Sequence, residues 1–149
     1  MTNVDTQSEE YYEDFLDQHI RNGDIYSSLR GDINKMVAEI HTALGSGHSE
    51  RVYHNAMEVL LRKNGIAYES ERIVPISFEG HVIGNLRADI IINNEQVLEF
   101  KTIKSLTDQS ETQALNYLNL TGLHCAYLIN FSPFPGKKVE VRKIVKPLE

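Results

Sequence analysis

Cysteine is almost absent from this chain of 149 residues, and long apolar runs are absent altogether. Cys125 is the only cysteine, which excludes a disulfide within the chain and a cysteine-rich zinc site. No run approaches the ~18 apolar residues of a membrane-spanning helix. Residues 1–10 are polar and acidic, unlike a signal peptide. These absences predict an intracellular protein with no membrane partner.

Several motifs of common enzyme classes are also missing. There is no glycine-rich phosphate loop and no nucleophile elbow, which argues against a nucleotide-binding fold and a serine hydrolase. The six histidines include no pair at i,i+4, so a zinc site is not expected. No helix-turn-helix or zinc-finger pattern is present, so the chain has no dedicated module for reading DNA.

The charge is unevenly distributed along the chain. Residues 1–30 hold seven acidic and two basic residues, whereas residues 31–149 hold 14 acidic and 13 basic residues. The composition, 41% hydrophobic, suits one compact domain. We therefore expect an acidic segment at residues 1–30, forming a short amphipathic helix or remaining disordered, and one domain at residues 31–149. A nearly neutral domain neither requires nor forbids a polyanionic partner.

Helical periodicity marks the first part of the domain. Ile33, Met36, Val37, Ile40 and Leu44 recur at the spacing of one helix face, in a helix that begins near Asp32 and ends near Gly45. Ser49 is a suitable N-cap for a second helix, which would end at Gly65.

Strand patterns dominate the second part. Residues 73–78 and 81–86 flank Glu79-Gly80, a hairpin signal, and residues 87–92 and 97–103 flank a polar turn. A helix is expected from Asp108, as N-cap, to residue 121, with Glu111 as the capping-box partner. Strands at 125–131 and 139–145 follow. This order predicts an α/β sandwich whose first strands are antiparallel.

The second predicted hairpin carries three ionisable groups. If Ala88, Ile90 and Ile92 pack on one face, Asp89 points to the other, where Glu99 and Lys101 also lie. Two carboxylates this close repel each other unless a cation lies between them, and oxygen ligands favour Mg²⁺ or Mn²⁺. The alternative is a solvent-exposed face with an ordinary ion pair, worth ~0–1 kcal/mol, in which Arg87 is a simple partner of Asp89.

The register of this hairpin tests the hypothesis. Asp89 lies opposite Glu99 or Lys101 only if the loop holds an odd number of residues or the hairpin contains a bulge. A two-residue turn at Asn94-Glu95 would instead pair Asp89 with Phe100 and send it to the opposite face.

Three motifs in this order resemble one known family. Asp89 followed by Glu99-x-Lys101 is similar to the signature of the PD-(D/E)XK nuclease superfamily. Gly47-x-x-Glu50-x-x-Tyr53 resembles the pattern that names the GxxExxY family within it, and Gln113-x-x-x-Tyr117 is similar to the QxxxY motif of RecB-like nucleases. The resemblance covers roughly residues 31–146.

The resemblance implies a restriction-endonuclease-like fold with a mixed central sheet flanked by helices, and a Mg²⁺- or Mn²⁺-dependent nuclease acting on nucleic acid, expected to be DNA. Asp89 and Glu99 would bind the metal, with Glu50 as a third ligand or a supporting base. Lys101 would position the attacking water, and Gln113 would orient water or a phosphate. Tyr117 and Tyr53 are possible supporting residues, although Tyr53 also fits the core.

Two further questions stay open in the sequence. The chain could instead be a catalytically inert domain of this fold that binds nucleic acid or a protein partner. A homodimer is possible, and the cellular location would be the cytoplasm, the nucleoid or the nucleus. The basic residues at the C-terminus suit either a solvated edge strand or a rim that contacts phosphates; they are Lys137, Lys138, Arg142, Lys143 and Lys146.

Overall fold

The computed structural model describes residues 26–146, so most of the predicted acidic segment lies outside the described residues. The elements are α2 (Tyr26–Leu44), α3 (Glu50–Lys63), β1 (Tyr68–Phe78), β2 (His81–Ile92), β3 (Gln96–Lys101), α4 (Asp108–Thr121), β4 (Cys125–Asn130) and β5 (Glu140–Val145). The strands form one sheet in the order β1-β2-β3-β4-β5. Neighbouring strands are antiparallel except β3 and β4, which run parallel and are joined by α4. The predicted α/β sandwich with a mixed sheet is confirmed.

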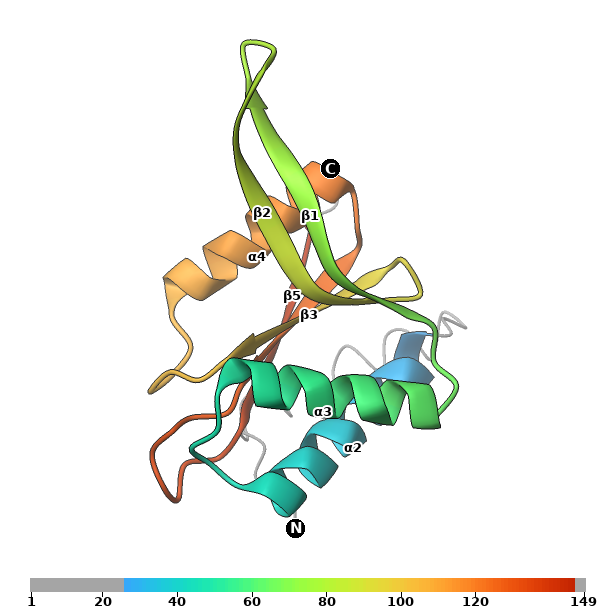
Figure 1. Cartoon of the computed structure of the whole chain (residues 1–149), viewed down its shortest axis with the longest axis vertical. Coiled ribbons are helices and arrows are strands. Elements are labelled where there is room, and N and C mark those ends of the chain that lie inside the picture. Colours follow the sequence, from blue (N-terminus) through green and yellow to red (C-terminus); the bar gives the residue numbers. More distant parts are fainter. Residues whose placement is uncertain (1–25, 147–149) are drawn as a thin grey trace.

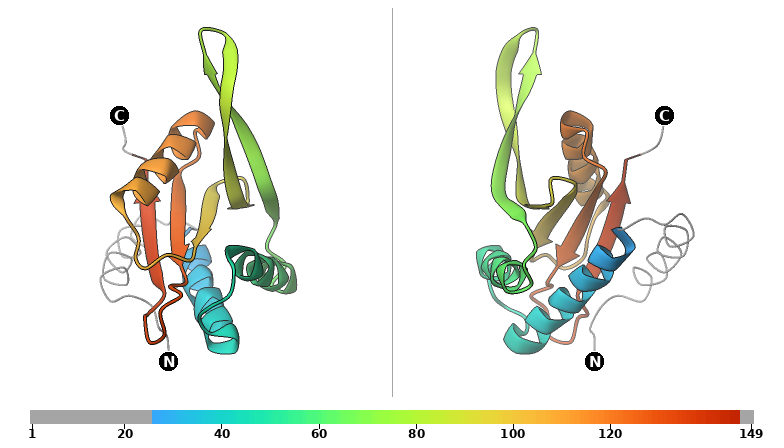
Figure 2. Two further views of the ribbon diagram at one scale, coloured as in Figure 1. Left: turned by 60° about the vertical axis from the view of Figure 1, so that its left-hand side comes forward. Right: turned by 90° about the vertical axis from the view of Figure 1, so that its right-hand side faces the viewer.

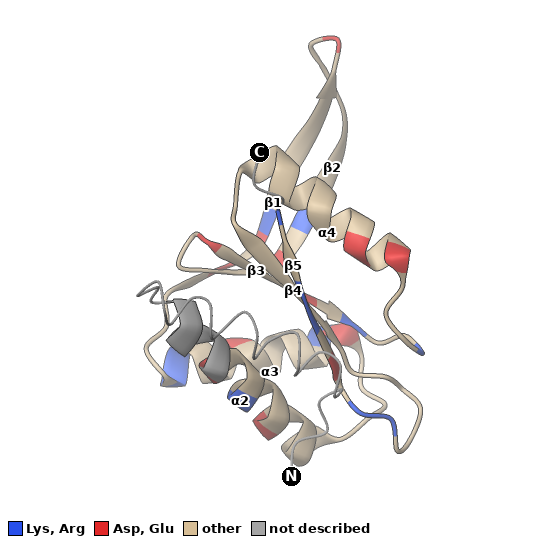
Figure 3. Cartoon of the chain, turned by 180° about the vertical axis from the view of Figure 1, so that it is seen from behind, with Lys and Arg blue, Asp and Glu red and all other residues tan. Residues whose placement is uncertain are grey.

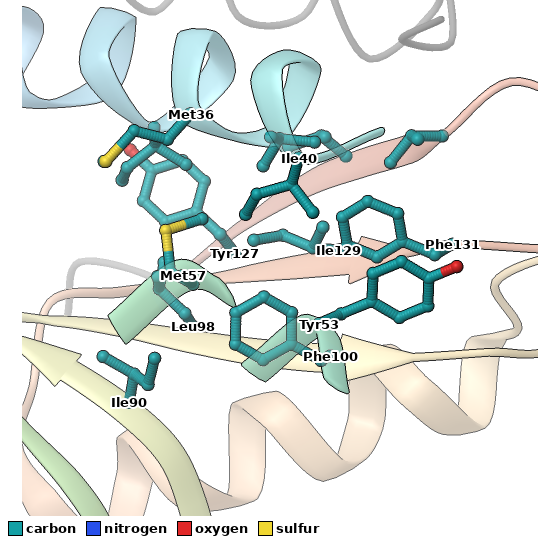
Figure 4. Close-up of a cluster of buried hydrophobic side chains, with 14 of the residues drawn as sticks. Met36, Ile40, Tyr53, Met57, Ile90, Leu98, Phe100, Tyr127, Ile129 and Phe131 are labelled. Atoms are coloured by element: carbon teal, nitrogen blue, oxygen red, sulfur yellow. The ribbon is translucent and has the colours of Figure 1, made fainter. Parts of the chain in front are cut away.

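Helices cover both faces of the sheet (Figure 1). α2 and α3 lie together on one face, and α4 crosses the other face; Figure 2 separates the two layers. The core under α2 and α3 is fully buried and aromatic (Figure 4). Within it, the ring of Tyr53 stacks on that of Phe131 with 4.0 Å between centroids. A second core, which includes Ala88, Ala114 and Leu118, lies between α4 and the sheet. These two cores hold β3 and β4 from both sides.

β1 and β2 form a long hairpin that projects beyond the rest of the sheet (Figures 1 and 2). The predicted strands 81–86 and 87–92 are one continuous strand, because no turn residue separates Leu86 from Arg87. Four large apolar side chains on the projecting part are more than half exposed: Ile73, Phe78, Val82 and Ile83. The part of the hairpin that lies against the sheet positions the candidate site.

The hairpin between β2 and β3 has the register that the site requires. Ile90 pairs with Leu98 and Ile92 with Gln96, so the loop holds the three residues 93–95. Asn93 and Asn94 both have positive φ, 51° and 56°, a conformation that asparagine tolerates better than most residues. The prediction of an odd loop is confirmed, and Asp89 and Glu99 each lie next to the last paired residues.

One detail of this hairpin was predicted wrongly. Ala88 packs in the core beneath α4, whereas Ile90 and Ile92 pack in the core beneath α2 and α3. The reason lies in β1, where Glu71 has φ 59° and interrupts the pairing between Ser70–Ile90 and Arg72–Ala88. The faces of the two strands exchange at this point. Ala88 and Ile90, two residues apart, therefore point to opposite sides of the sheet.

Two predicted helix starts also differ. α2 begins at Tyr26, before the predicted start at Asp32, so the expected boundary at 30/31 falls inside a helix. The N-cap of α4 is Thr107 and not Asp108, because the extended Thr107 accepts a bond from the N–H of Ser110 and leaves Asp108 in the first turn. Within residues 26–146, no helix has the length and apolar character needed to cross a membrane.

Candidate active site

A cleft of about 290 Å³ lies between α4 and the strands β2 and β3, beside the first turn of α3. It brings together every residue of the predicted site except Tyr53. Its polar lining consists of Glu50, Asn85, Arg87, Asp89, Glu99, Lys101, Ser110, Gln113 and Tyr117. Residues from four elements, far apart in the sequence, therefore face one small volume.

Asp89 lies where β2 leaves β3. The pairing of these two strands ends at Ile90 and Leu98. Two residues further along β3, the N–H of Phe100 donates to Oδ2 of Asp89 at 2.8 Å. The carboxylate thus takes the place of a backbone acceptor. This bond fixes Asp89 next to Glu99, which follows Leu98 on β3.

The ionisation of Glu99 is strongly perturbed. Burial, and the negative charge of Asp89, raise the pKa of Glu99 from 4.5 to about 8. The charges of Lys101 and Arg87 act in the opposite direction without cancelling the effect. A pair of carboxylates with this shift holds a proton at neutral pH, or gives it up when a cation is bound between them.

Lys101 closes β3 at the edge of the cleft. Its carbonyl accepts a bond from Phe131 N–H at 2.9 Å. The loop that follows is held by the buried Asn130, whose side chain bonds both N–H and carbonyl of Ile103 at 2.9 Å. Glu140 accepts from Asn130 Nδ2 and from the N–H of Leu106, each at 3.0 Å. Sequence reasoning missed Asn130 and Glu140, which shape this loop.

The same loop borders a second, more open cleft of about 540 Å³ next to the first. Its lining residues are Glu50, Lys101, Ile103, Lys104, Ser105, Thr107, Gln109, Ser110 and Gln113. Glu50, Lys101 and Gln113 line both clefts, so they lie where the two meet. The two clefts therefore adjoin each other at these residues.

Glu50 is the first residue of α3 and is exposed to solvent. Ser49 caps the helix by accepting a bond from Val52 N–H at 3.4 Å. Among residues 26–146, no three His, Cys, Asp or Glu side chains are grouped closely enough to hold a metal ion directly. Glu50 lines both clefts from the first turn of α3.

The two tyrosines of the predicted site have different surroundings. Tyr53 is fully buried; its hydroxyl donates to Gly45 carbonyl at 2.6 Å and accepts from His48 N–H at 3.3 Å. It fixes the turn before α3 and does not line the cleft. Tyr117 lines the cleft, is 3% exposed, and its hydroxyl has no hydrogen-bond partner among the described residues. Burial also raises the pKa of Tyr117.

The basic C-terminal residues do not form one phosphate-binding rim. Lys143 is 2% exposed, and its Nζ lies 5.8 Å from the ring centroid of Tyr127. Arg142 is paired with Glu111 at 2.8 Å and with Glu140 at 3.7 Å. Two of the five residues of the predicted cluster are therefore committed to contacts within the protein.

Arg87 does contact Asp89, as the alternative interpretation required, at 3.9 Å between Nη2 and Oδ1. It also contacts Glu71, at 3.8 Å between Nη1 and Oε1, and Glu71 is paired in turn with Arg51 of α3. Arg51 and Glu71 were not predicted, because their proximity depends on the irregular strand pairing at Glu71.

The carboxylate pair fits a hard divalent cation. Asp89 and Glu99 could supply oxygen ligands, and the pKa of Glu99 is raised first by burial and then by the negative charge of Asp89, which a bound cation would offset. With Asp89 and Glu99 as the direct ligands, water would complete the coordination, as is usual for Mg²⁺.

Comparison with known proteins agrees with this geometry. The sequence profile of the PD-(D/E)XK nuclease superfamily matches residues 27–144. Among solved structures, that of SSO0001 is 27% identical with a TM-score of 0.50, and the match covers 67% of this chain and 52% of that one. An alkaline exonuclease from Laribacter hongkongensis is 10% identical with a TM-score of 0.48, over 65% of this chain and 56% of that one.

This chain thus spans about half the length of both solved structures. No curated protein sequence matches it. The profile match covers most of the chain and includes every residue that lines the two clefts. The chain therefore belongs to the PD-(D/E)XK nuclease superfamily and has its restriction-endonuclease-like fold.

Proposed function

We propose that this protein is a Mg²⁺- or Mn²⁺-dependent nuclease that hydrolyses phosphodiester bonds in DNA. The observation that carries the proposal is the meeting of Asp89, Glu99 and Lys101 in one cleft, where the pKa of Glu99 is raised to about 8. A binding module has no need for a half-buried pair of repelling carboxylates. Superfamily nucleases generally use divalent metals, which supports the choice of cofactor.

The polar residues of the cleft have different roles in the proposed reaction. Asp89 and Glu99 would hold the metal, and Glu50 would serve as a third ligand or accept a proton from the attacking water. The ammonium group of Lys101 orients that water and stabilises the negative charge that develops on the phosphate. Gln113, exposed at the junction of the two clefts, orients water or a substrate phosphate. When bound, the metal supplies Lewis-acid stabilisation of the phosphate oxygens.

We also propose the narrower assignment to the GxxExxY family with a RecB-like QxxxY motif. Glu50 faces the cleft from the first turn of α3, and Gln113 and Tyr117 face it one turn apart on α4. Because one such site cuts one strand, cleavage of both strands of a duplex would use two copies of the chain.

The test is cleavage of labelled nucleic acids with Mn²⁺, Mg²⁺ or EDTA. Linear duplex, single-stranded and branched DNA, together with RNA, are compared, and Glu99→Ala is the inactive variant. Glu79→Ala, which removes one carboxylate at the exposed hairpin tip, is the matched control. Metal-dependent cleavage by the parent and by Glu79→Ala, lost in Glu99→Ala, supports the proposal. Cleavage that survives in Glu99→Ala refutes it.

The inert-domain alternative is favoured by one observation, namely that residues 26–146 contain no three-ligand metal group. A thermal shift measurement separates the two. A nuclease site predicts stabilisation by Mn²⁺ that Asp89→Asn abolishes, whereas an inert domain predicts no response in either protein.

A further inference from the structure

Glu71 holds an unfavourable backbone conformation in the middle of β1. Its φ of 59° lies in the left-handed region, which a residue with a side chain rarely adopts within a strand. Ser70 pairs with Ile90 and Arg72 with Ala88, so Glu71 lies across from Asp89 at the one position between them where pairing is interrupted. A non-glycine residue in this conformation is often kept for function.

The Glu71 carboxylate is held by two arginines from different elements. Arg51, next to Glu50 on α3, donates to Oε1, and Arg87 of β2 lies 3.8 Å from the same atom. The side chains of Arg51 and Arg87 are 52% and 55% exposed. Exposed ion pairs of this kind add little to stability, so stability alone does not account for the unfavourable conformation of Glu71.

A polyanion can bind at the cleft only if positive charge lies nearby. The cleft presents Glu50, Asp89 and Glu99, which would repel a polyanion that approaches without counter-charges. The hairpin beyond Arg87 offers none, since residues 73–86 contain Glu79 as their only charged residue and the basic residues of the hairpin lie near its base (Figure 3). Arg87 lines the cleft beside Asp89, and Arg51 reaches Glu71 from the first turn of α3. The pKa of Arg51 is raised by Glu71 and, to a smaller extent, by the charge of the nearby Asp89. Lys101 lines both clefts.

We infer that Arg51 and Arg87 bind a phosphate group of the nucleic acid strand next to the bond that is cut, and that Glu71 is the residue that positions them. The inference rests on the proposed function and adds a second phosphate site to it. A guanidinium group offers five N–H donors in a planar fork, so each arginine can contact Glu71 on one side and a phosphate on the other. Arg87 contacts both Glu71 and Asp89. Because Glu71 takes part of the positive charge of Arg87, Arg87 neutralises the Asp89 carboxylate only in part.

The first test measures binding without cleavage, by fluorescence anisotropy of labelled single-stranded and duplex DNA in EDTA, in the Glu99→Gln background. Arg51→Gln and Arg87→Gln should each raise Kd about tenfold and reduce the slope of log K against log salt by about 1. Arg62→Gln is the matched control on α3, since Arg62 is equally exposed and also contacts neighbours, Glu58 and Tyr68. If the Arg51 and Arg87 variants behave like Arg62→Gln, the phosphate site does not exist.

The second test separates positioning from simple charge. Removing a carboxylate near a polyanion should by itself tighten binding and leave turnover unchanged. If Glu71 positions the arginines, Glu71→Gln keeps or tightens binding but lowers kcat about tenfold, whereas Glu69→Gln on the same strand leaves kcat unchanged. An unchanged kcat in Glu71→Gln refutes the positioning role.

The outcomes distinguish this inference from the proposed function. If the parent protein cuts DNA and all arginine variants bind DNA normally, the nuclease function stands and the phosphate site is refuted. If the parent protein cuts no nucleic acid, the nuclease function is refuted. The anisotropy measurement alone then decides whether Arg51 and Arg87 bind phosphate.

Discussion

Glu99 should make the metal-free protein less stable as the pH rises. Its pKa is raised from 4.5 to about 8 by burial and by Asp89. Below pH 4.5 the carboxyl is protonated in the folded and unfolded chains, and it costs nothing. Between pH 4.5 and 8 the unfolded chain has lost this proton while the folded chain retains it, so the free energy of unfolding falls with rising pH. Above about pH 8 the loss is complete.

The magnitude follows from the same values. Each pKa unit corresponds to about 1.4 kcal/mol, which sets an upper limit of about 5 kcal/mol for the whole shift. Glu99 is only partly covered and water reaches the cleft, so we expect about 2–3 kcal/mol. Glu99→Gln has the same shape and no charge to bury. In EDTA it should be as stable as the parent near pH 4.5 and about 2–3 kcal/mol more stable near pH 8.

The assay is urea unfolding at a series of pH values in EDTA, repeated with Mn²⁺. Mn²⁺ should stabilise the parent, by about 2.7 kcal/mol at a concentration 100 times its Kd, and leave Glu99→Gln unchanged. Glu79→Gln controls for loss of one carboxylate at an exposed position. Parent and Glu99→Gln curves that run parallel from pH 5 to pH 8 would refute the reasoning, because the carboxyl would then ionise freely in the fold.

Three further variants separate the roles of the neighbouring residues. Lys101→Ala should lower kcat about 10²–10³-fold while Mn²⁺ still stabilises the protein in a thermal shift assay, because it deletes no metal ligand. Tyr117→Phe removes a buried hydroxyl without a partner among residues 26–146, so urea unfolding should show unchanged or slightly higher stability, and any loss of kcat then reports a contact with water or substrate. Tyr53→Phe loses the bond to Gly45 and should cost about 1 kcal/mol of stability without changing kcat per folded molecule.

Local signals in the sequence predicted the element order, the family resemblance implied the mixed sheet, and the register of the second hairpin was the condition that the hypothesis of a carboxylate site set. The apolar period of 33–44 reflects a single buried face of that helix, and the alternation of Leu98, Glu99 and Phe100 separates Glu99 from the core under α3. Two adjacent asparagines suit a loop of three residues, which fixes the parity of the pairing. Register then brought the predicted carboxylates to one cleft without knowledge of any distant contact.

Residues joined only by long-range geometry could not be predicted in this way. Glu71 meets Arg51 and Arg87 where it interrupts the strand pairing with a positive φ, and glutamate gives no sequence signal for that conformation. The pairing with Arg51 needs α3 to be placed against β1, which depends on the packing of both cores. For the same reason the inward position of Lys143 was missed, since lysine in an edge strand is usually exposed.

The site lies where β2 and β3 separate, and this explains how the fold accommodates two repelling carboxylates. β2 leaves β3 after Ile90–Leu98 and stays paired with β1, so Asp89 satisfies the free N–H of Phe100 and gains a fixed position. The opposite face of β3 is closed by Leu98 and Phe100, which are buried under α3. Near the site the core under α3 stabilises one face of β3, whereas Glu99 lies on the other face, where Val97 is buried in the second core. Variants of Glu99 should accordingly lose function and gain metal-free stability, whereas variants of Phe100 should lose both.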